Sequence, residues 1–397
     1  MSYSSEAMKV NVREIPGPPA AREERNFFHP SPCALPDGRW LLSFQRILNA
    51  DCYGAPELTT TTDEGGHWSA PVPIAPLGTT SLVNGLQLGV ADVRPMLSPD
   101  GGKVLFIGCN ATYVNNQASV YQSDVAVAAD YERGAYYTVY DLATNIFGKK
   151  KVLRNPRLEP QREWRVACAQ GCVTPDGDWL LPAYFEHSEK FEYMKGYFSS
   201  RYAVETVKVR LEGDTLVPVA WSNQLTYETM RGFIEPSLIR RPGGYFLTIR
   251  AEDGRAYATR SADGLSWPQP QAWHFDDGMP LHTDSTQQHW LAAGGRLFLV
   301  YTRHSPESAR AMRYRSILFL AEVDEAAAGP TLLKETEMML YPPRREDGLD
   351  GVLGNFHVCS LPDGSALVGD AYLFAKVYGD CFVEPHSELV LKKVVTC

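Results

Sequence analysis

The sequence has no long hydrophobic run: no stretch approaches the roughly 18 apolar residues that a membrane helix needs. Met1–Val12 is polar and lacks the basic region, apolar core and small-residue cleavage site of a signal peptide. Positive charge is also scarce, because 38 Lys and Arg stand against 47 Asp and Glu and give a net charge of −9. We therefore expect a soluble, cytoplasmic protein with no nucleic acid or membrane as a partner, although a few arginines in one pocket would still bind an anionic sugar.

Cysteine shows no pattern that marks a disulfide framework or a metal site. A reducing compartment keeps the eight scattered cysteines as thiols, at positions 33, 52, 109, 168, 172, 359, 381 and 397. The spacing of Cys168 and Cys172 differs from that of a zinc knuckle and predicts two thiols on one strand. Gly101-Gly102 and Gly243-Gly244 lack the strand-to-helix context of a phosphate-binding loop. We expect no metal and no nucleotide, flavin or haem cofactor.

Turn signals of one kind recur along the chain at intervals of very roughly 50 to 75 residues, and an apolar strand follows each of them. The six turns are Leu35-Pro36-Asp37-Gly38, Ser98-Pro99-Asp100-Gly101, Thr174-Pro175-Asp176-Gly177, Arg241-Pro242-Gly243-Gly244, Ala292-Ala293-Gly294-Gly295 and Leu361-Pro362-Asp363-Gly364. One four-stranded sheet fits each interval, so the sequence predicts an all-β, six-bladed β-propeller of four-stranded antiparallel blades. Residues 1–397 form one domain in this prediction, with 1–25 as an N-terminal arm and 374–397 as the tail that closes the ring.

Two further turns resemble the Asp-box, in which a carboxylate and a hydroxyl hold loop amides while an indole packs under the blade. They are Thr61-x-Asp63-x-Gly65-x-x-Trp68 and the shorter Ser261-x-Asp263-Gly264-x-x-Trp267, which closes a meander of short strands in Ile234–Pro268. Helix signals are sparse, and Asn145–Arg165 and Glu186–Tyr202 are the places where we expect a short helix or an irregular insertion that carries substrate loops.

Over nearly its whole length the chain resembles the sialidase superfamily of Asp-box propellers. Leu35–Arg46 resembles the family's first-blade segment of a turn, a strand and a closing arginine. Ala169–Ala183 resembles the middle-blade segment in which Gly, Gln and a strand ending in Pro-Ala face the substrate. Glu235-Pro236 followed by Arg250 resembles the family's pairing of a catalytic Glu with a carboxylate-binding Arg, and Asp51 resembles its acid/base Asp.

The resemblance implies an exo-acting glycoside hydrolase that removes a terminal acidic sugar, sialic-acid-like or uronate, from an oligosaccharide. Such a reaction needs arginines that clamp the carboxylate, an acid for the leaving oxygen and a base or nucleophile on the other face. Asp51 then becomes the acid, and Glu235 orients or deprotonates the nucleophile. The implied substrate-binding residues are Arg46, Gln170, Arg250, Arg303 and Arg313; the third arginine of the clamp comes from Arg303 or from among Arg310, Arg313 and Arg315.

Two segments depart from the family's pattern. Sialidases carry Arg-Ile-Pro near the start of the first blade, and the matching place here reads Phe27-Phe28-His29-Pro30. Their nucleophilic tyrosine precedes the turn of the last blade, and the matching place here reads Gly354-Asn355-Phe356-His357. The covalent intermediate on tyrosine therefore lacks its residue, unless Tyr341 or Tyr372 reaches the channel.

Histidine takes the place of the missing residues. His29, His289 and His357 each lie just before or within an expected inner strand, and inner strands of a propeller converge on the channel. Because histidine gives and takes a proton near neutral pH, these three residues with Tyr113 or Tyr184 would also suit a lyase that acts on uronate-containing oligosaccharides.

Three hypotheses follow from these residues. The first is a hydrolase of acidic sugars that uses Asp51, Glu235 and Arg250. The second is a histidine-dependent lyase or glycosidase acting on uronate- or rhamnose-containing oligosaccharides through His29, His289 and His357. The third is a propeller that binds carbohydrate without catalysis. The sequence leaves the oligomeric state open.

Overall fold

The computed structural model describes residues 10–82, 85–118, 131–194, 197–378 and 381–396. The fold is all-β, with only 4% of its residues helical. Within these ranges the helices are short 3-10 turns: η1 (Arg22–Glu24), η2 (Ala75–Leu77), η5 (Met312–Tyr314) and η6 (Lys334–Thr336). No helix among the described residues has the length and apolar character that a membrane span requires.

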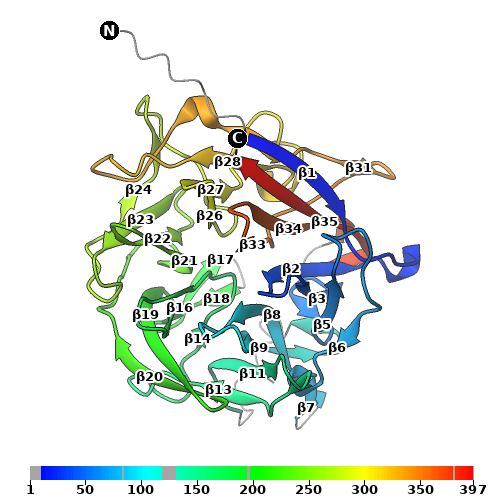
Figure 1. The fold of residues 1–397 in the computed structure, drawn as a ribbon. Helices are drawn as coiled ribbons and strands as arrows, with labels where there is room; N and C mark the ends of the chain where they lie inside the picture. The colour runs from blue at the N-terminus through cyan, green and yellow to red at the C-terminus, as the bar shows by residue number, and fades with distance from the viewer. Residues whose placement is uncertain (1–9, 83–84, 119–130, 195–196, 379–380, 397) are drawn as a thin grey trace.

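Antiparallel sheets are arranged as blades around a central axis, and the first strand of each lies nearest that axis (Figure 1). The first sheet contains β2 (Phe27–Ala34), β3 (Trp40–Asn49), β5 (Glu57–Thr61) and β6 (Val72–Pro73), with β4 (Cys52–Tyr53) paired to β3. The second contains β8 (Gln87–Leu97), β9 (Lys103–Val114), β11 (Ala135–Asp141) and β12 (Ile146–Phe147), with the short strands β7 (Thr80–Ser81), β10 (Gln117–Ala118) and β13 (Lys151–Leu153).

The second half of the chain repeats this order. One sheet contains β21 (Ile234–Arg241), β22 (Gly244–Arg250), β23 (Ala256–Ser261) and β24 (Gln271–Ala272), and the next contains β26 (His289–Ala293), β27 (Arg296–Tyr301), β28 (Leu318–Glu322) and β30 (Met338–Tyr341). The last contains β33 (His357–Ser360), β34 (Ala366–Tyr378), β35 (Cys381–Thr396) and β1 (Val10–Pro16). Small two-stranded pairs link them: parallel β25 (His274–Phe275) with β29 (Thr331–Leu332), and β31 (Arg345–Glu346) with β32 (Leu349–Asp350).

A propeller of five blades is detected, so the prediction of six four-stranded blades is wrong. The strands β16 (Trp179–Glu186), β19 (Tyr202–Glu212) and β20 (Thr215–Trp221) also form a sheet, but it lacks a continuous inner strand. Among the described residues, that place holds β14 (Trp164–Arg165) and β15 (Cys172–Val173), two residues each, both paired with β16. Each turn signal in the sequence marks one hairpin. It therefore cannot show that the inner strand before that hairpin is interrupted.

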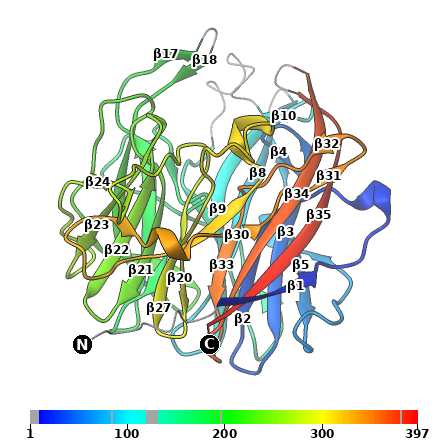
Figure 2. The same cartoon turned by 90° about the horizontal axis from the view of Figure 1, so that it is seen from above.

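The long connections contain strands instead of the short helix that the sequence allowed. Residues 145–165 contain β12, β13 and β14, and residues 186–202 contain the hairpin of β17 (Phe191–Met194) and β18 (Tyr197–Ser199). Seen from the side, β17, β18, β10 and β4 lie toward the same end of the propeller (Figure 2). This end therefore carries the irregular segments that follow the second strands β3, β9 and β16.

The two turns that resemble Asp-boxes hold their loops with side-chain hydrogen bonds. Asp63 Oδ1 accepts hydrogen bonds from the Thr61 hydroxyl and from the His67 amide, each at 2.8 Å. Asp263 Oδ1 accepts the amides of residues 265 and 266 at 2.8 and 2.7 Å. The buried Trp267 indole donates to the Thr206 hydroxyl of the neighbouring sheet at 3.1 Å, so the turn also fastens two sheets together.

The two ends of the chain meet in one sheet. Strand β1 pairs with β35 over seven residue pairs, from Val10 with Thr396 to Pro16 with Val390, and Figure 1 shows the two strands side by side in blue and red. Ile15 is 3% exposed and packs in a cluster with Trp40 and Leu391, which joins the last sheet to the first. Residues 10–16 are therefore the outer strand of the sheet that closes the ring.

We predict that Ile15→Ala lowers the free energy of unfolding by about 2–4 kcal/mol, because it leaves a cavity where the first and last sheets meet. Urea denaturation followed by tryptophan fluorescence measures this change. Arg13→Ala on the same strand is the matched control: its side chain is 56% exposed and pairs with Glu64, so it should change stability by less than about 1 kcal/mol. Equal effects of the two substitutions would show that β1 does not close the ring.

Candidate functional site

Four segments share one backbone irregularity near the propeller axis. His29, Asp92, Cys168 and Glu235 have left-handed φ angles of 49°, 53°, 52° and 50°. Three of them lie at breaks of register in the inner strands β2, β8 and β21, and Cys168 lies between β14 and β15. Because this conformation costs roughly 1–2 kcal/mol for a residue with a Cβ atom, its repetition indicates a constraint imposed by the site.

A regular spacing marks these four residues in the sequence. Each stands six residues before the first position of a predicted turn: His29 before Leu35, Asp92 before Ser98, Cys168 before Thr174 and Glu235 before Arg241. Our sequence analysis used the turns only to count blades, and it therefore missed Asp92 and Cys168. Aligning the blades on their turns would have found both.

Asp92 is the centre of a buried inner group, which comprises His29, Asp92, Cys168, His289 and His357. Its carboxylate accepts a hydrogen bond from His357 Nε2 at 2.6 Å through Oδ1, and one from the Cys168 amide through Oδ2. The ring centres of His357 and His289 are 5.2 Å apart. The three histidines that the sequence singled out are therefore brought together, although they are only 4%, 0% and 3% exposed in chain order.

Charge and burial set the protonation of the inner group. Burial alone would raise the pKa of Asp92, but the charges of His357 and His29 hold it well below its usual range. Burial lowers the pKa of His29 despite the opposing charge of Asp92, and it lowers the pKa of His289 well below its usual range. His29 and His289 are therefore neutral near pH 7, and Asp92 is an anion.

A second group, the arginine group, comprises Arg231, Arg250, Arg313 and Arg315 with Glu235 and Glu252. Arg250 donates from Nη1 to both carboxylate oxygens of Glu235, at 2.7 and 2.8 Å, and from Nη2 to Glu252 Oε1 at 3.0 Å. Arg231 binds Glu252 with two hydrogen bonds, and Arg313 Nη2 lies 3.8 Å from the same Glu252 Oε1. Three guanidinium groups thus meet at one carboxylate.

Backbone carbonyls hold two of these arginines side by side. Arg250 Nε donates to the carbonyl of Asp284 at 2.9 Å, and Arg315 Nε donates to the carbonyl of the next residue, Ser285, at 2.8 Å. Asp284 itself accepts a hydrogen bond from His304 Nε2 at 2.8 Å. The carbonyls of residues 284 and 285 therefore fix the spacing between Arg250 and Arg315. Because a carbonyl is uncharged, it does not neutralise the guanidinium that it binds.

The arginine group has a surplus of positive charge. Burial lowers the pKa of Arg313, and the charge of Arg250 adds to this shift. Burial also lowers the pKa of Arg315, with further contributions from Arg313 and Arg250. Both shifts come first from burial, with repulsion between the guanidinium groups as a smaller contribution. Arg231, Arg250 and Arg313 contact two carboxylates and Arg315 contacts a carbonyl, so the group is suited to bind an additional anion.

Asp51 lies at the edge of the arginine group. It is exposed, has a left-handed φ of 51° in the turn between β3 and β4, and accepts a hydrogen bond from the Tyr53 hydroxyl at 3.1 Å. Its charge is the smallest of the effects on the pKa of Arg315, and it also acts on the pKa of His29. Contacts join Glu235 to Arg250 directly and Arg313 to them through Glu252, whereas Asp51 interacts with these residues through its charge.

Three other residues that we expected to bind substrate have structural contacts instead. Arg46 pairs with Glu57 and covers the ring of Phe27. Arg303 donates two 2.7 Å hydrogen bonds to Glu337. The Gln170 side chain donates to the carbonyl of Trp290 and accepts its amide, at 3.0 and 2.8 Å. The side chains that we expected to bind the sugar thus already have polar partners within the protein.

Tyr341 and Tyr372 do not supply the missing tyrosine. The Tyr341 hydroxyl, on β30, is buried and hydrogen-bonds to the carbonyls of Val368 and Val390 in the neighbouring last sheet. The Tyr372 hydroxyl donates to the carbonyl of Pro342 at 2.7 Å. Tyr113 is 2% exposed, and its hydroxyl has no hydrogen-bond partner.

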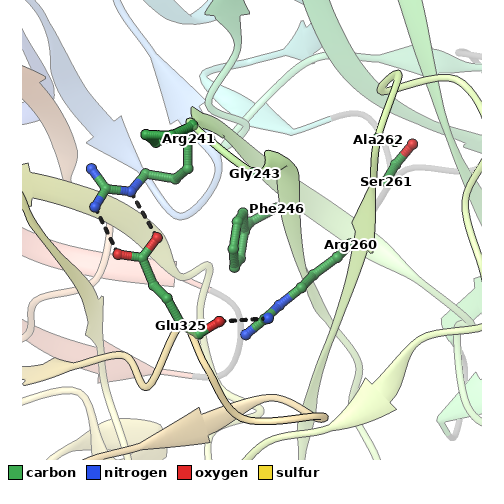
Figure 3. A pocket seen from close by; sticks show the side chains of 8 residues that line it. Arg241, Gly243, Phe246, Arg260, Ser261, Ala262 and Glu325 are labelled. Carbon is green, nitrogen blue, oxygen red and sulfur yellow. Dashed lines mark hydrogen bonds and ion pairs between the residues drawn. The ribbon is translucent and has the colours of Figure 1, made fainter.

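A hollow of about 480 Å³ lies away from these groups, at the turn between β21 and β22 (Figure 3). Its cationic side chains are already engaged, since Arg241 donates to both carboxylate oxygens of Glu325 and Arg260 donates to the Glu325 carbonyl. Phe246 forms the apolar wall between them. None of its lining residues belongs to the inner group or the arginine group.

Comparison with solved structures finds proteins of similar fold, two sialidases among them. A protein of unknown function from Dyadobacter fermentans is 16% identical with a TM-score of 0.63, covering 97% of this chain and 99% of that one. The intramolecular trans-sialidase of Ruminococcus gnavus is 12% identical with a TM-score of 0.60, covering 94% and 95%. Trypanosoma rangeli sialidase is 14% identical with a TM-score of 0.56, and the match covers 96% of this chain but 57% of that one.

At these identities the comparisons show the fold alone. No protein-family model matches the sequence, and no curated protein matches it. The activity must therefore be argued from the site.

One buried carboxyl supports the loop of residues 354–357. Asp370 is 1% exposed and accepts the amides of Gly354 and Ala371, each at 2.8 Å. Burial raises its pKa to about 7, and these hydrogen bonds oppose the shift. Between about pH 4 and pH 7 the folded chain thus keeps a proton that the unfolded chain has released, so Asp370 makes stability fall as pH rises through this window.

We predict that Asp370→Asn, which imitates the protonated carboxyl, reduces the loss of stability between pH 5 and pH 8 by roughly 1–4 kcal/mol. Urea denaturation at both pH values measures the difference. Asp214→Asn is the control. The Asp214 side chain is 53% exposed and pairs with Lys151, which lowers its pKa, so this carboxyl titrates below the range from pH 5 to pH 8. An unchanged pH dependence in Asp370→Asn would contradict the assigned shift.

Proposed function

We propose that this chain is a sialidase-like glycoside hydrolase that removes a terminal acidic sugar, sialic-acid-like or uronate, from oligosaccharides. The observation that carries the proposal is the surplus of positive charge in the arginine group. In a chain with a net charge of −9, a local excess of guanidinium groups calls for an anionic ligand. Guanidinium matches a carboxylate in shape and donates two parallel hydrogen bonds to it.

Arg250, Arg313 and Arg315 are the arginines that we assign to the sugar carboxylate. Arg313 is the most accessible, with 49% of its side chain exposed, and its 3.8 Å approach to Glu252 leaves it able to turn to a ligand. Arg250 and Arg315 are held by the carbonyls of residues 284 and 285, which orders them before the sugar arrives. Preordered donors lose less entropy on binding than mobile ones.

Two carboxylates flank this clamp and would perform the acid and base steps. Asp51 is exposed and would protonate the leaving oxygen, whereas Glu235, with 14% of its side chain exposed, would orient and deprotonate a water molecule. Residues 354–357 offer no hydroxyl that could attack the sugar. We therefore propose direct displacement by water, with inversion at the anomeric carbon.

Product analysis tests this function. The chain is incubated with sialylated and uronate-terminated oligosaccharides, and the products are followed by mass spectrometry and near-ultraviolet absorbance. Hydrolysis adds one water to the released sugar and gives no absorbance, as we expect. An unsaturated, absorbing product would instead establish the elimination that the histidines suggested, and the absence of turnover on every substrate would favour a binding propeller.

We predict that Arg313→Gln lowers kcat/KM for an acidic substrate by roughly 10- to 100-fold, mainly through KM, because one charge-assisted hydrogen bond to the carboxylate is lost. Arg310→Gln is the matched control: it removes a nearby charge that is 68% exposed and lies 3.8 Å from Asp350. Initial rates over a range of substrate concentrations separate kcat from KM. Equal kinetics for wild type and Arg313→Gln would exclude this arginine from the clamp.

We predict that Asp51→Asn and Glu235→Gln each lower kcat by at least about 100-fold while the chain still binds the sugar. Single-turnover rates and calorimetric titration with the acidic sugar measure the two effects. Asp37→Asn, in a surface turn beside Arg39, is the control and should keep the wild-type rate. Full activity in both site variants would move the chemistry away from these carboxylates.

A further inference from the structure

The inner group gathers three different metal-ligating side chains from three sheets. One ligand atom each of His29, Asp92 and Cys168 lies within 4.8 Å of the other two. His29 comes from β2, Asp92 from β8, and Cys168 from the segment between β14 and β15. Residues more than 60 positions apart therefore present a nitrogen, an oxygen and a sulfur to one place near the propeller axis.

The backbone holds these three residues in the same strained way. They are three of the four that share the left-handed conformation at corresponding positions of their sheets. A single left-handed residue can arise for many reasons. Three that carry potential metal ligands and meet at one point indicate a common cause. Strain of this kind persists where the surroundings fix a functional side chain.

An unpartnered nitrogen points to a ligand at this place. His29 is 4% exposed, and within the described part of the chain no group hydrogen-bonds to its Nδ1. A buried polar atom of this kind is costly unless something binds to it. Nearby, His289 Nδ1 is 2.7 Å from the Ser237 hydroxyl, and the other ring nitrogen, Nε2, also has no partner.

Neighbouring groups already orient the carboxylate. His357 Nε2 and the Cys168 amide bind one oxygen of Asp92 each, and Gln45 Oε1 accepts the Asp92 amide at 2.8 Å. Each carboxylate oxygen keeps a second lone pair. Partners of this kind commonly fix the direction of a metal ligand.

We propose that His29, Asp92 and Cys168 bind a zinc-class divalent transition-metal ion on the propeller axis. Imidazole, carboxylate and thiolate ligands suit Zn²⁺, whereas Mg²⁺ and Ca²⁺ require oxygen ligands. Zinc lies about 2.0–2.3 Å from such atoms, so binding draws the three ligands to roughly 3.3–3.8 Å from one another and releases the Cys168 thiol proton to solvent. Three protein ligands leave a fourth position for water or for His289.

This inference is independent of the proposed function, because none of its steps uses the arginine group. The sequence did not suggest it, since it paired Cys168 with Cys172 and found the spacing wrong for zinc. The actual neighbours of Cys168 lie in other sheets, and spacing along one segment cannot show them.

The test is metal binding by the full chain after removal of metals with a chelator. Titration with Zn²⁺ alone should give one ion per chain by calorimetry and elemental analysis. Titration with Co²⁺ alone should produce the near-ultraviolet thiolate-to-cobalt band that only a sulfur ligand gives. The surface cluster of Glu346, Asp347 and His386 contains no sulfur and cannot produce this band.

Cys168→Ser should abolish the cobalt band and weaken Zn²⁺ binding by about 100-fold or more, whereas Cys172→Ser should keep both. His29→Ala is the second variant: we expect loss of the single Zn²⁺ site in a chain whose metal-free melting temperature stays close to that of wild type. No stoichiometric binding by wild type, a band that survives in Cys168→Ser, or unchanged binding in His29→Ala would overturn the proposal.

Discussion

The left-handed residue at the break of an inner strand is the constraint on which the site depends. In β2, β8 and β21 one extra residue interrupts the ladder, and between β14 and β15 a longer segment does the same. An uninterrupted strand would direct alternate side chains into the two neighbouring sheets, where the hydrophobic clusters lie. The break instead frees His29, Asp92, Cys168 and Glu235 to face the axis, at a conformational cost that packing of the surrounding sheets repays.

The inner group and the arginine group differ in their balance of charge. Asp92 compensates the buried histidines, and its own charge is held by hydrogen bonds from His357 and from the Cys168 amide. Around Glu235 and Glu252 the balance is reversed, because three guanidinium groups contact two carboxylates and a fourth, Arg315, is held nearby by the Ser285 carbonyl. An enclosed inner group that contains one buried carboxylate suits a bound cation or a structural role, whereas a cationic and partly exposed group suits an acidic substrate.

The sequence predicted the all-β propeller because turns and alternating apolar residues are local signals, and five of the turns do connect a continuous inner strand to the second strand, as between β2 and β3. It overcounted the blades because the break at 166–171 does not alter the turn at Thr174. The resemblance pointed to Arg250 and Glu235 and left Arg313 as one of several candidates, whereas Glu252 and Arg231 carry no local signature and became visible only through their contacts. The assignment of Arg46, Arg303 and Gln170 to the substrate stays a prediction, and the sequence could not show that Glu57, Glu337 and Trp290 already contact their polar groups.

A crystal structure of the chain soaked with an acidic monosaccharide tests most directly whether the inner strands build an anion site. We expect the sugar carboxylate to lie among Arg250, Arg313 and Arg315, with Asp51 and Glu235 on either side of the sugar ring. Sugar bound in the hollow at the turn between β21 and β22, which Arg241, Phe246 and Arg260 line, with none at the arginine group, would contradict the central claim that the propeller axis is the functional site.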